Sequence, residues 1–215
     1  MRRLVGLLLV VGGCILLVWQ LVQPSVSAHR TEKAQAALAA EVPVGAERLT
    51  RTGPPVSRGV DEGAAWAALS IPRFGEGWRW IVVEGTGTEE LESGPGHYVG
   101  TPQLGARGNT AIAAHRAGHG DPFLEFDTLR SGDVVVVQQG DVRWTYRLDV
   151  APTIVMPEDT WVLDPSPTRR LTLTTCWPRY GSAKRMYVSG GLTEVAERNG
   201  AGPWETVWER RPGSM

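Results

Sequence analysis

Residues 171–176 read Leu-Thr-Leu-Thr-Thr-Cys and alternate apolar with β-branched side chains, as an extended strand does. Turn-forming residues follow at 177–182, and a second strand-like segment runs from Arg185 to Val188. The pattern predicts two neighbouring strands joined by a short loop, with Cys176 at the end of the first strand. A thiol in that position, followed closely by arginines, is placed for nucleophilic chemistry.

The rest of the chain repeats this alternation of short strand-like segments and turns. The strand candidates lie at residues 67–72, 78–84, 109–114, 133–138, 142–150 and 185–190. Short helices are expected at 88–92 and 122–129. Many short strands, tight turns and little helix favour a mostly β fold in which the sheet closes into a small barrel.

The N-terminus carries the features of a membrane anchor. Arg2 and Arg3 precede an uncharged apolar segment of 19 residues, from Leu4 to Val22. As a helix this segment would be about 28 Å long, close to the hydrocarbon thickness of a bilayer. Basic residues before the segment, and no comparable basic cluster after it, favour a cytoplasmic N-terminus. We expect a single-pass protein of the cell membrane whose remaining residues are extracytoplasmic.

Two other interpretations of the N-terminus stay open. Residues 26–28, Val-Ser-Ala, resemble a cleavage site, so the segment could be a removed signal peptide, although its apolar region is longer than usual. Residues 11–14 loosely resemble a lipoprotein signal that ends at Cys14, but the apolar segment continues past this cysteine. The length of the segment favours a retained anchor.

Composition divides the chain into four parts. We expect the cytoplasmic start and anchor at 1–27, an extracytoplasmic stalk and linker at 28–63, a barrel domain at 64–195 and a tail at 196–215. The stalk begins with an alanine-rich stretch that favours a short helix, and prolines and glycines over 43–63 indicate an extended linker. The tail is either docked through its tryptophans or mobile. A net charge of −1 gives no electrostatic basis for binding nucleic acid.

Three side chains, far apart in the sequence, carry the chemistry that a cysteine enzyme needs. Cys176 has no evident disulfide partner, because the only other cysteine, Cys14, lies in the predicted anchor. An unperturbed thiol is mostly protonated at neutral pH, so a nucleophilic cysteine requires a nearby histidine or cation. His115 ends a predicted buried strand, and Arg185 begins the strand after the Cys176 loop, where its guanidinium could stabilise an oxyanion.

Each of these residues also has a purely structural interpretation. A single cysteine in a strand is often a small buried hydrophobic residue. The ring of His115 could bond a backbone carbonyl, and Arg185 could be a solvated charge on a strand. Residue types and spacing alone leave these alternatives open.

A metal site is a further alternative use of the histidines. His115, His119 and Asp121 are metal-ligand types at short spacing. However, Gly118 and Gly120 disfavour the helix that would align residues four apart, and no glutamate follows His115. We therefore expect no metal, and the sequence calls for no other cofactor.

Two segments of the sequence, together with Arg185, resemble the sortases, which are membrane-anchored cysteine transpeptidases. Residues 172–176, Thr-Leu-Thr-Thr-Cys, are similar to the TLxTC motif, and Arg185 lies nine residues later in the position of the family arginine. Residues 108–116, Gly-Asn-Thr-Ala-Ile-Ala-Ala-His-Arg, resemble the segment that carries the family histidine, with Ala114 where many relatives have glycine. The resemblance runs from about residue 66 to residue 192, and the N-terminal anchor also matches.

The resemblance implies a fold and a set of roles. The fold would be the eight-stranded sortase β-barrel with short helices, preceded by an N-terminal transmembrane helix and linker. Cys176 would be the nucleophile and His115 the acid or base. Arg185 would hold the substrate carbonyl and the developing oxyanion.

The same resemblance implies a reaction. Sortases cleave a C-terminal sorting signal of LPxTG type, carried by secreted proteins, between threonine and glycine, and form a thioester on the cysteine. An amine, often from the peptidoglycan precursor lipid II, resolves the thioester and joins the protein to the cell wall. Histidinium can protonate the leaving amine, and neutral histidine can then take a proton from the incoming amine.

A hint of the subclass comes from residues 93–98, Ser-Gly-Pro-Gly-His-Tyr, which resemble the corresponding segment of class D and class E sortases. Tyr98 is similar to the class E pattern, which is associated with LAxTG-type signals, and its hydroxyl would lie near the second residue of the signal. Thr174, Thr175 and Ala113 are expected to line the groove floor. A glycine-rich turn that packs an aromatic ring, and plain core strands, are the alternatives. With the arginine-rich composition, these features favour a housekeeping enzyme of an actinobacterium.

Two further functions stay open. The chain could be a pilin-polymerising sortase, in which a pilin lysine supplies the amine. Such enzymes usually carry a lid before the barrel, and the linker here has no obvious aromatic anchor for one. The chain could also be a non-catalytic, membrane-anchored barrel that binds a peptide without cleaving it. The presence of all three reactive side chains argues against that function.

Overall fold

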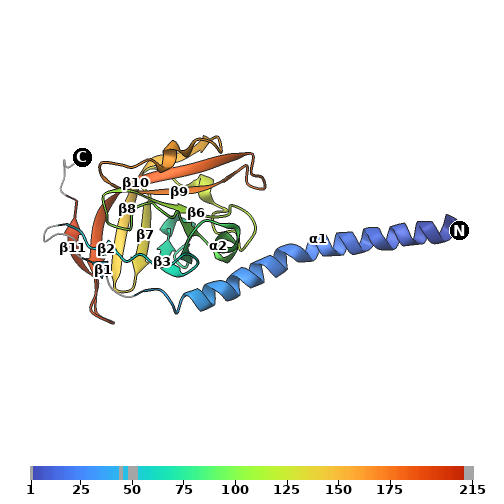
Figure 1. Cartoon of the computed structure of the whole chain (residues 1–215), viewed down its shortest axis with the longest axis horizontal. Coiled ribbons are helices and arrows are strands. Elements are labelled where there is room, and N and C mark those ends of the chain that lie inside the picture. The colour runs from blue at the N-terminus through green and yellow to red at the C-terminus, as the bar shows by residue number, and fades with distance from the viewer. Residues whose placement is uncertain (1, 44–45, 48–52, 211–215) are drawn as a thin grey trace.

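Residues 171–176 lie in strand β9 (Arg169–Trp177), which pairs antiparallel with β10 (Lys184–Glu197), as their pattern predicts. The computed structural model describes residues 2–43, 46–47 and 53–210 of the 215-residue chain. Figure 1 shows a barrel of strands and one long helix, α1 (Arg2–Leu38), that projects from it.

Nine further strands and four short helical segments complete the described part of the chain. The strands are β1 (Ala46–Glu47), β2 (Val56–Ser57), β3 (Ala65–Ser70), β4 (Arg79–Glu84), β5 (Gly96–His97), β6 (Gly108–Ala113), β7 (Val134–Gln139), β8 (Val142–Val155) and β11 (Glu205–Glu209). The helical segments are α2 (Thr88–Ser93), η1 (Pro72–Phe74), η2 (Phe126–Thr128) and η3 (Thr160–Leu163). The helix expected at 88–92 is present as α2, whereas the one expected at 122–129 is reduced to the single turn of η2.

Eight of the strands close into a barrel. Their order around the barrel is β10, β8, β7, β3, β4, β5, β6 and β9, and β9 pairs again with β10 to complete the ring. Most neighbours are antiparallel, but the pairs β4–β5 and β6–β9 are parallel. The mostly β, eight-stranded barrel that the sequence predicts is therefore confirmed.

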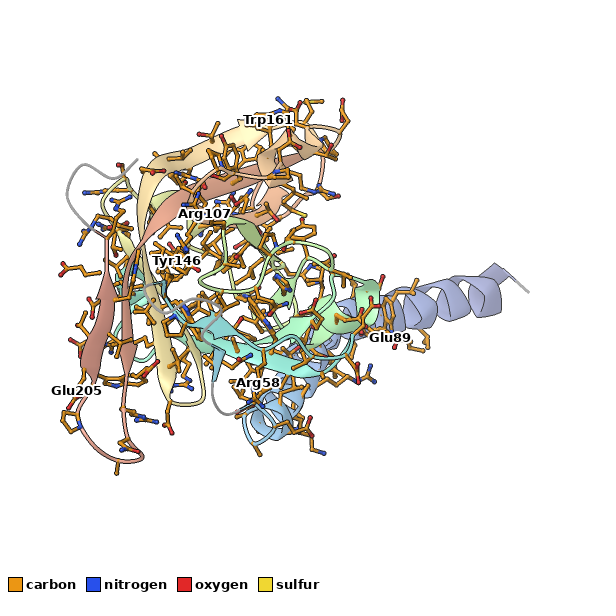
Figure 2. The ribbon with its side chains drawn as sticks, turned by 60° about the vertical axis from the view of Figure 1, so that its left-hand side comes forward. Arg58, Glu89, Arg107, Tyr146, Trp161 and Glu205 are labelled. Carbon is orange, nitrogen blue, oxygen red and sulfur yellow. The ribbon has the colours of Figure 1, made fainter. Side chains whose placement is uncertain are left out.

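Large aromatic side chains fill the barrel. Trp66, Trp144 and Tyr146 are each at most 1% exposed, and Tyr146 is labelled among the strands in Figure 2. The indole N–H groups are paired, because Trp66 Nε1 donates to Gln103 Oε1 at 2.7 Å and Trp144 Nε1 donates to Pro55 O at 2.9 Å. Aromatic surface is thus buried without leaving these N–H donors unsatisfied, which stabilises the barrel.

Part of the predicted linker packs against the barrel. Pro55 and Ser57 are buried, and Ser57 N donates to Leu104 O at 3.0 Å. The sequence predicts an extended linker over 43–63, but these residues of it are bound to the barrel. They are bound because buried donors of the barrel use backbone carbonyl groups of this segment as partners. The domain limits themselves, at residues 63 and 195, stay predictions.

The sheet also continues past the predicted end of the barrel domain at residue 195. β10 runs to Glu197, and β11 pairs antiparallel with its last residues. The guanidinium carbons of Arg143 and Arg198 lie 4.7 and 4.8 Å from the ring centroid of Trp204. The described part of the predicted tail is therefore docked on the barrel, which is one of the two alternatives that the sequence leaves open.

Helix α1 runs without a break into the alanine-rich stretch and ends at Leu38, and its last turns dock on the barrel beside α2. Gln35 Nε2 donates to Ile81 O at 2.9 Å and to Ser93 O at 2.8 Å, and Gln35 Oε1 accepts from Ile81 N at 2.6 Å. The pairing of β4 with β5 begins only at Val83, so the amide of Gln35 takes the place of a strand partner at Ile81.

The predicted membrane-spanning segment, Leu4–Val22, falls within α1. Over the residues that the structure describes, no helix is both long enough and apolar enough to cross a bilayer. The membrane anchor and the orientation derived from it stay predictions from the sequence.

Candidate active site

Cys176 and Arg185 face each other across two strands. Cys176 is the penultimate residue of β9, and Arg185 is its direct partner in β10. Residues opposite each other in an antiparallel pair project from the same face of the sheet. Cys176 is a free thiol and is partly exposed, so a substrate can reach its Sγ.

His115 is the second residue after β6, which runs parallel to β9. Ala114 N donates to Thr174 O at 3.2 Å, and Thr175 Oγ1 donates to Ala114 O at 2.8 Å, so the end of β6 is held against β9. Continuing the register of these two strands by two residues brings His115 level with Cys176.

The three residues predicted to be catalytic therefore meet at one end of three neighbouring strands, β6, β9 and β10. Arg185 Nη1 donates to Ser182 O at 3.0 Å and to Lys184 O at 3.1 Å, so one nitrogen of the guanidinium is bound to the loop that follows Cys176. This arrangement places a thiol, a titratable imidazole and a permanent cation at one end of the sheet, and these are the groups that acyl transfer uses.

The imidazole of His115 is half-buried and stacks on that of His119. The two ring centroids are 4.7 Å apart, and the ring planes differ by 24°. Burial lowers the pKa of His115 below its ordinary value, charge repulsion from His119 lowers it further, and Glu92 opposes both effects. A lowered pKa favours the neutral imidazole, which is the form that accepts a proton.

A groove with a volume of about 850 Å³ lies beside His119, between α1 and α2. Its walls include Ser27 of α1, Glu89 of α2, and Tyr180 in the loop that follows Cys176. His119 N donates to Ser27 Oγ at 3.2 Å, and Figure 2 shows Glu89 beside the ribbon of α1. Helix α1 therefore reaches the loop whose histidine stacks on His115.

The face that carries Cys176 continues along β6, β9 and β10, where the sequence predicts the floor of a substrate groove. Ala113, Thr174 and Tyr187 form one row across these strands. Thr174 Oγ1 lies 3.0 Å from the hydroxyl oxygen of Tyr98, which comes from the segment after β5. The structure thus brings Ala113, Thr174 and Tyr98 together on the face of Cys176, and their contact with a substrate stays a prediction.

Thr175 lies on the other face of β9. It is 3% exposed, its partner in β10 is the core residue Met186, and its hydroxyl is bound to Ala114 O. Successive strand side chains point to opposite faces, so Thr175 does not share a face with Thr174 and Cys176. Among the residues expected on the groove floor, Thr175 is the exception, and it joins β6 to β9 instead.

Beyond the row of Tyr187, the same face carries a cavity of about 320 Å³. Its walls include Asn109, Thr172 and Ser189 on the strands, and Trp161 on η3. The rings of Trp161 and Tyr187 pack edge to face with centroids 5.7 Å apart, and Trp161 is labelled in Figure 2. Sequence reasoning missed this cavity, because η3 carries no motif and is brought over the strands only by the folding of the barrel.

Arg116 is another residue to which the sequence assigned no role. It is 1% exposed although it is charged, and its Nη2 lies 2.8 Å from Asp127 Oδ1. Its guanidinium carbon lies 4.8 Å from the ring centroid of Trp177, the residue after Cys176. Arg116 therefore connects the loop after His115 to the loop after Cys176, and its place directly after His115 is the one signal in the sequence.

The geometry also bears on the metal alternative. The rings of His115 and His119 stack face to face, an arrangement that does not aim a nitrogen of each ring at one ion. The carboxylate of Asp121 accepts from Gly118 N at 2.6 Å. Within the described residues, no group of three or more His, Cys, Asp and Glu side chains could hold a metal ion.

Known proteins similar to this chain agree on one family. The family model described as the sortase domain matches residues 69–193, which is more than half of the chain. Sortase SrtE1 of Streptomyces coelicolor is 33% identical over 162 residues, which cover 66% of this chain and 44% of that protein. Sortase D of Bacillus subtilis is 29% identical over 134 residues, which cover 61% of this chain and 65% of that protein.

A solved structure, that of sortase E from Streptomyces avermitilis, matches with a TM-score of 0.62 and 40% identity, over 67% of this chain and 97% of that chain. A closed barrel with a free thiol, an imidazole and a guanidinium at one end defines a candidate cysteine enzyme of the acyl-transfer type. The chain belongs to the sortase family. Its predicted likeness to class E and class D is confirmed, because its relatives include both, and the matched part spans less than two thirds of either curated relative.

Proposed function

We propose that the protein is a transpeptidase that cleaves a C-terminal sorting signal through a thioester on Cys176 and transfers the cleaved protein to an amine. The observation that carries this proposal is the position of Cys176, His115 and Arg185 at one end of β6, β9 and β10, on a face that also carries a cavity. Membership of the sortase family supports it. A barrel that only bound a peptide would need none of the three reactive groups.

In the first half-reaction, Cys176 Sγ attacks the carbonyl carbon of the threonine in the signal. The amide bond between threonine and glycine breaks, a thioester forms, and protonated His115 donates a proton to the leaving amine. Arg185 lies opposite Cys176 and donates N–H groups to the carbonyl oxygen as its negative charge develops.

In the second half-reaction, an amine attacks the thioester carbonyl. Neutral His115 accepts a proton from the incoming amine, the sulfur leaves, and a new amide bond joins the threonine to the acceptor. Burial and the repulsion from His119 lower the pKa of His115, and they support this step because they favour the neutral base.

In this proposal, an extended signal of the LPxTG or LAxTG type lies along the face of β9 that carries Cys176. With the threonine at Cys176, the second residue of the signal lies about 7 Å away along β9, level with Thr174 and Tyr98. An alanine there keeps the N–H that a proline lacks, and the Tyr98 hydroxyl can accept a hydrogen bond from it. The leucine that begins the signal then reaches towards the aromatic wall of Trp161 and Tyr187.

The cellular setting belongs to the same proposal. The substrates are secreted proteins with a C-terminal sorting signal, and the acceptor is lipid II or another peptidoglycan amine. The apolar segment Leu4–Val22 anchors the chain in the membrane. The barrel lies on the extracytoplasmic side, where substrate and acceptor are both present.

A peptide assay tests the proposed function. The full-length chain is incubated with an LAxTG peptide and a small amine, and mass spectrometry follows the glycine-containing product and the new amide. We expect both products from the unaltered chain and neither from Cys176→Ala. Cys14→Ala is the matched control, because it removes the other free thiol and should leave turnover unchanged. Unchanged turnover by Cys176→Ala would remove Cys176 from the mechanism.

A further inference from the structure

A buried histidine lies behind the groove and takes no part in the chemistry proposed above. His97 ends β5 and is 0% exposed. Its Nδ1 lies 2.8 Å from Glu84 Oε2 on β4, and its Nε2 lies 2.9 Å from Thr101 Oγ1. The ring of Trp66 stacks on the imidazole, with centroids 4.1 Å apart and planes 16° apart. Carboxylate, imidazole and hydroxyl form one hydrogen-bonded chain, and we call Glu84, His97 and Thr101 the His97 relay.

The His97 relay leads to the backbone of Tyr98. Thr101 N and Thr101 Oγ1 both donate to Tyr98 O, at 3.0 and 2.9 Å. Residues 98–101 form a turn in which Gly100 has the positive φ, 87°, that the third position of a type II turn requires. From β6, Ala111 O accepts from Tyr98 N at 2.9 Å, and Ala111 N donates to Thr101 Oγ1 at 3.2 Å. The N–H and the C=O of Tyr98 are therefore both held.

The single proton of the Thr101 hydroxyl determines how the His97 relay acts on the turn at residues 98–101. The Thr101 hydroxyl has a single proton, so it donates to Tyr98 O only if it does not donate to His97 Nε2. His97 must then carry a proton on Nε2 and donate it to Thr101 Oγ1. The Glu84 carboxyl group either accepts a second imidazole proton at Nδ1 or donates its own proton to Nδ1. In both states the relay directs the Thr101 proton to Tyr98 O.

The fixed turn at residues 98–101 determines where the side chain of Tyr98 lies in the predicted groove. Its hydroxyl oxygen lies 3.0 Å from Thr174 Oγ1, on the face of β9 that also presents Cys176. Val99, the next residue of the turn, is 60% exposed, so packing at that position does not hold the turn in place. A side chain that projects from a turn keeps one position only when the backbone beneath it is fixed by further contacts.

We propose that His97 is a positioning residue for substrate recognition, because through Thr101 it fixes the turn that carries Tyr98 and so sets where the Tyr98 hydroxyl meets the sorting signal. The identity of the ligand rests on the proposed function. The new claim is that affinity for the signal depends on a buried histidine that does not touch it.

Removal of the Thr101 hydroxyl tests the proposal, because this hydroxyl joins His97 to Tyr98. Its removal leaves the hydrogen bond between Glu84 and His97 in place. Thr101→Val keeps the shape of the side chain without the hydroxyl. It should raise KM for an LAxTG peptide about tenfold, as expected for the loss of about one buried hydrogen bond, with kcat little changed. Thr101→Ser restores the hydroxyl and should return KM to within about twofold of that of the unaltered chain.

A double-mutant cycle separates positioning from general destabilisation. Tyr98→Phe removes only the hydroxyl that the relay places. If the relay acts through Tyr98, Thr101→Val should raise KM much less in the Tyr98→Phe background than in the unaltered chain. Equal increases in KM in both backgrounds would overturn the proposal, because a merely structural role of His97 gives that result.

A second measurement does not depend on turnover. The chain has 4 tyrosines, so the ring signals of ¹³C-labelled tyrosine can be assigned individually by NMR. Thr101→Val should shift and broaden the Tyr98 signal and leave that of buried Tyr146 in place. Thr101→Cys retains a weak S–H donor and, if the valine variant does not fold, should shift the same signal by a smaller amount.

The NMR result also separates this inference from the proposed function. A shifted Tyr98 signal in a chain that does not process the peptide would support the positioning role of His97 and refute the proposed function. A Tyr98 signal that stays in place in the Thr101 variants overturns the positioning role, whatever the turnover.

Discussion

Arg185 shows how a single residue combines two tasks. It lies opposite Cys176 in β10, and its Nη1 donates to Ser182 O and Lys184 O in and beside the loop after β9. A guanidinium presents five N–H groups in one plane, so it can keep these contacts and still donate to a substrate oxygen. A lysine has one compact ammonium at the end of a flexible chain and cannot cover both tasks.

We therefore expect Arg185→Lys to lower kcat/KM for the sorting peptide by about 100-fold or more, the usual effect of losing an oxyanion donor. The peptide assay with amine measures this change. Lys184→Arg alters the charge carrier at the neighbouring exposed position and should have little effect. Near-normal turnover of Arg185→Lys would show that the oxyanion is bound elsewhere.

A second prediction for single residues concerns the effect of His119 on the pKa of His115. Without the repulsion from His119, the pKa of His115 should rise towards its ordinary value. The basic form of His115 is lost as pH falls through this pKa, so His119→Ala should move the acid limb of the aminolysis profile to higher pH. His29→Ala removes an exposed histidine of α1 and should leave the profile in place. An acid limb that stays fixed in His119→Ala would contradict the role of His115 as the base.

Residue types and motifs identify Cys176, His115 and Arg185, because their chemistry is visible in the sequence. The sequence predicts less well to which face of the sheet a strand side chain points where polar residues follow one another. Thr174 and Thr175 look alike in the sequence, yet the first faces Tyr98 in the groove and the second bonds the end of β6. Only the pairing of β9 with both neighbours separates them, and that pairing is non-local.

At the scale of elements, one buried cation in the loop after β6 contacts the last residue of β9. Arg116 is 1% exposed, whereas the side chain of its partner Asp127 is 36% exposed and also contacts Arg179. Burial alone would raise the pKa of Asp127, but Arg116 and Arg179 hold it below the usual value. The contribution of Asp127 to stability is therefore present above the unfolded carboxyl pKa and is lost as pH falls through the lower, folded value.

Asp127→Ala leaves the guanidinium of Arg116 buried without its carboxylate. We expect the free energy of unfolding to fall by about 2 kcal/mol at neutral pH, less than for a fully buried pair because solvent screens the exposed Asp127. The loss should be smaller at acid pH, where the parent also lacks the charge. Asp141→Ala is the matched control, because its partner Arg198 is half-exposed and the pair is worth at most about 1 kcal/mol. Urea unfolding measures both values, and equal losses would show that Arg116 does not depend on Asp127.

The elements that the sequence predicts best are those with a long alternating pattern. β7 (Val134–Gln139) and β8 (Val142–Val155) overlap the strand candidates at 133–138 and 142–150, because apolar residues recur at alternate positions along most of each strand. β2 and β5 contain two residues each and have no pattern of their own. They are defined by their partners, and therefore the sequence could not reveal that His97 lies in a strand beside Glu84.

At the scale of the whole molecule, residues before the predicted domain limit at residue 63 contact the barrel. Pro55, Ser57 and Arg58 all bond the barrel from the predicted linker, and Arg58 N donates to Gln139 Oε1 at 2.7 Å. On the other side of the linker, Gln35 fastens the end of α1 to β4. The stalk is therefore attached to the barrel at two places along its length.

These contacts predict a difference between two truncated chains. A chain that starts at residue 53 keeps seven hydrogen bonds between residues 53–63 and the barrel, and a chain that starts at residue 64 loses them. We expect the shorter chain to be less stable by several kcal/mol, at about 1 kcal/mol for each bond. Urea unfolding of the two fragments measures the difference. Equal stability would show that residues 53–63 are a linker after all, as their composition suggests.

Trapping the acyl-enzyme tests the convergence of the three side chains most directly. The chain is mixed with an LAxTG peptide in the absence of amine, quenched with acid, digested and mapped by mass spectrometry. We predict an adduct on Cys176 that ends at the threonine of the signal, with a reduced yield in Arg185→Lys and none in Cys176→Ala. An adduct on a different residue, or cleavage between threonine and glycine that persists in Cys176→Ala, would contradict the mechanism.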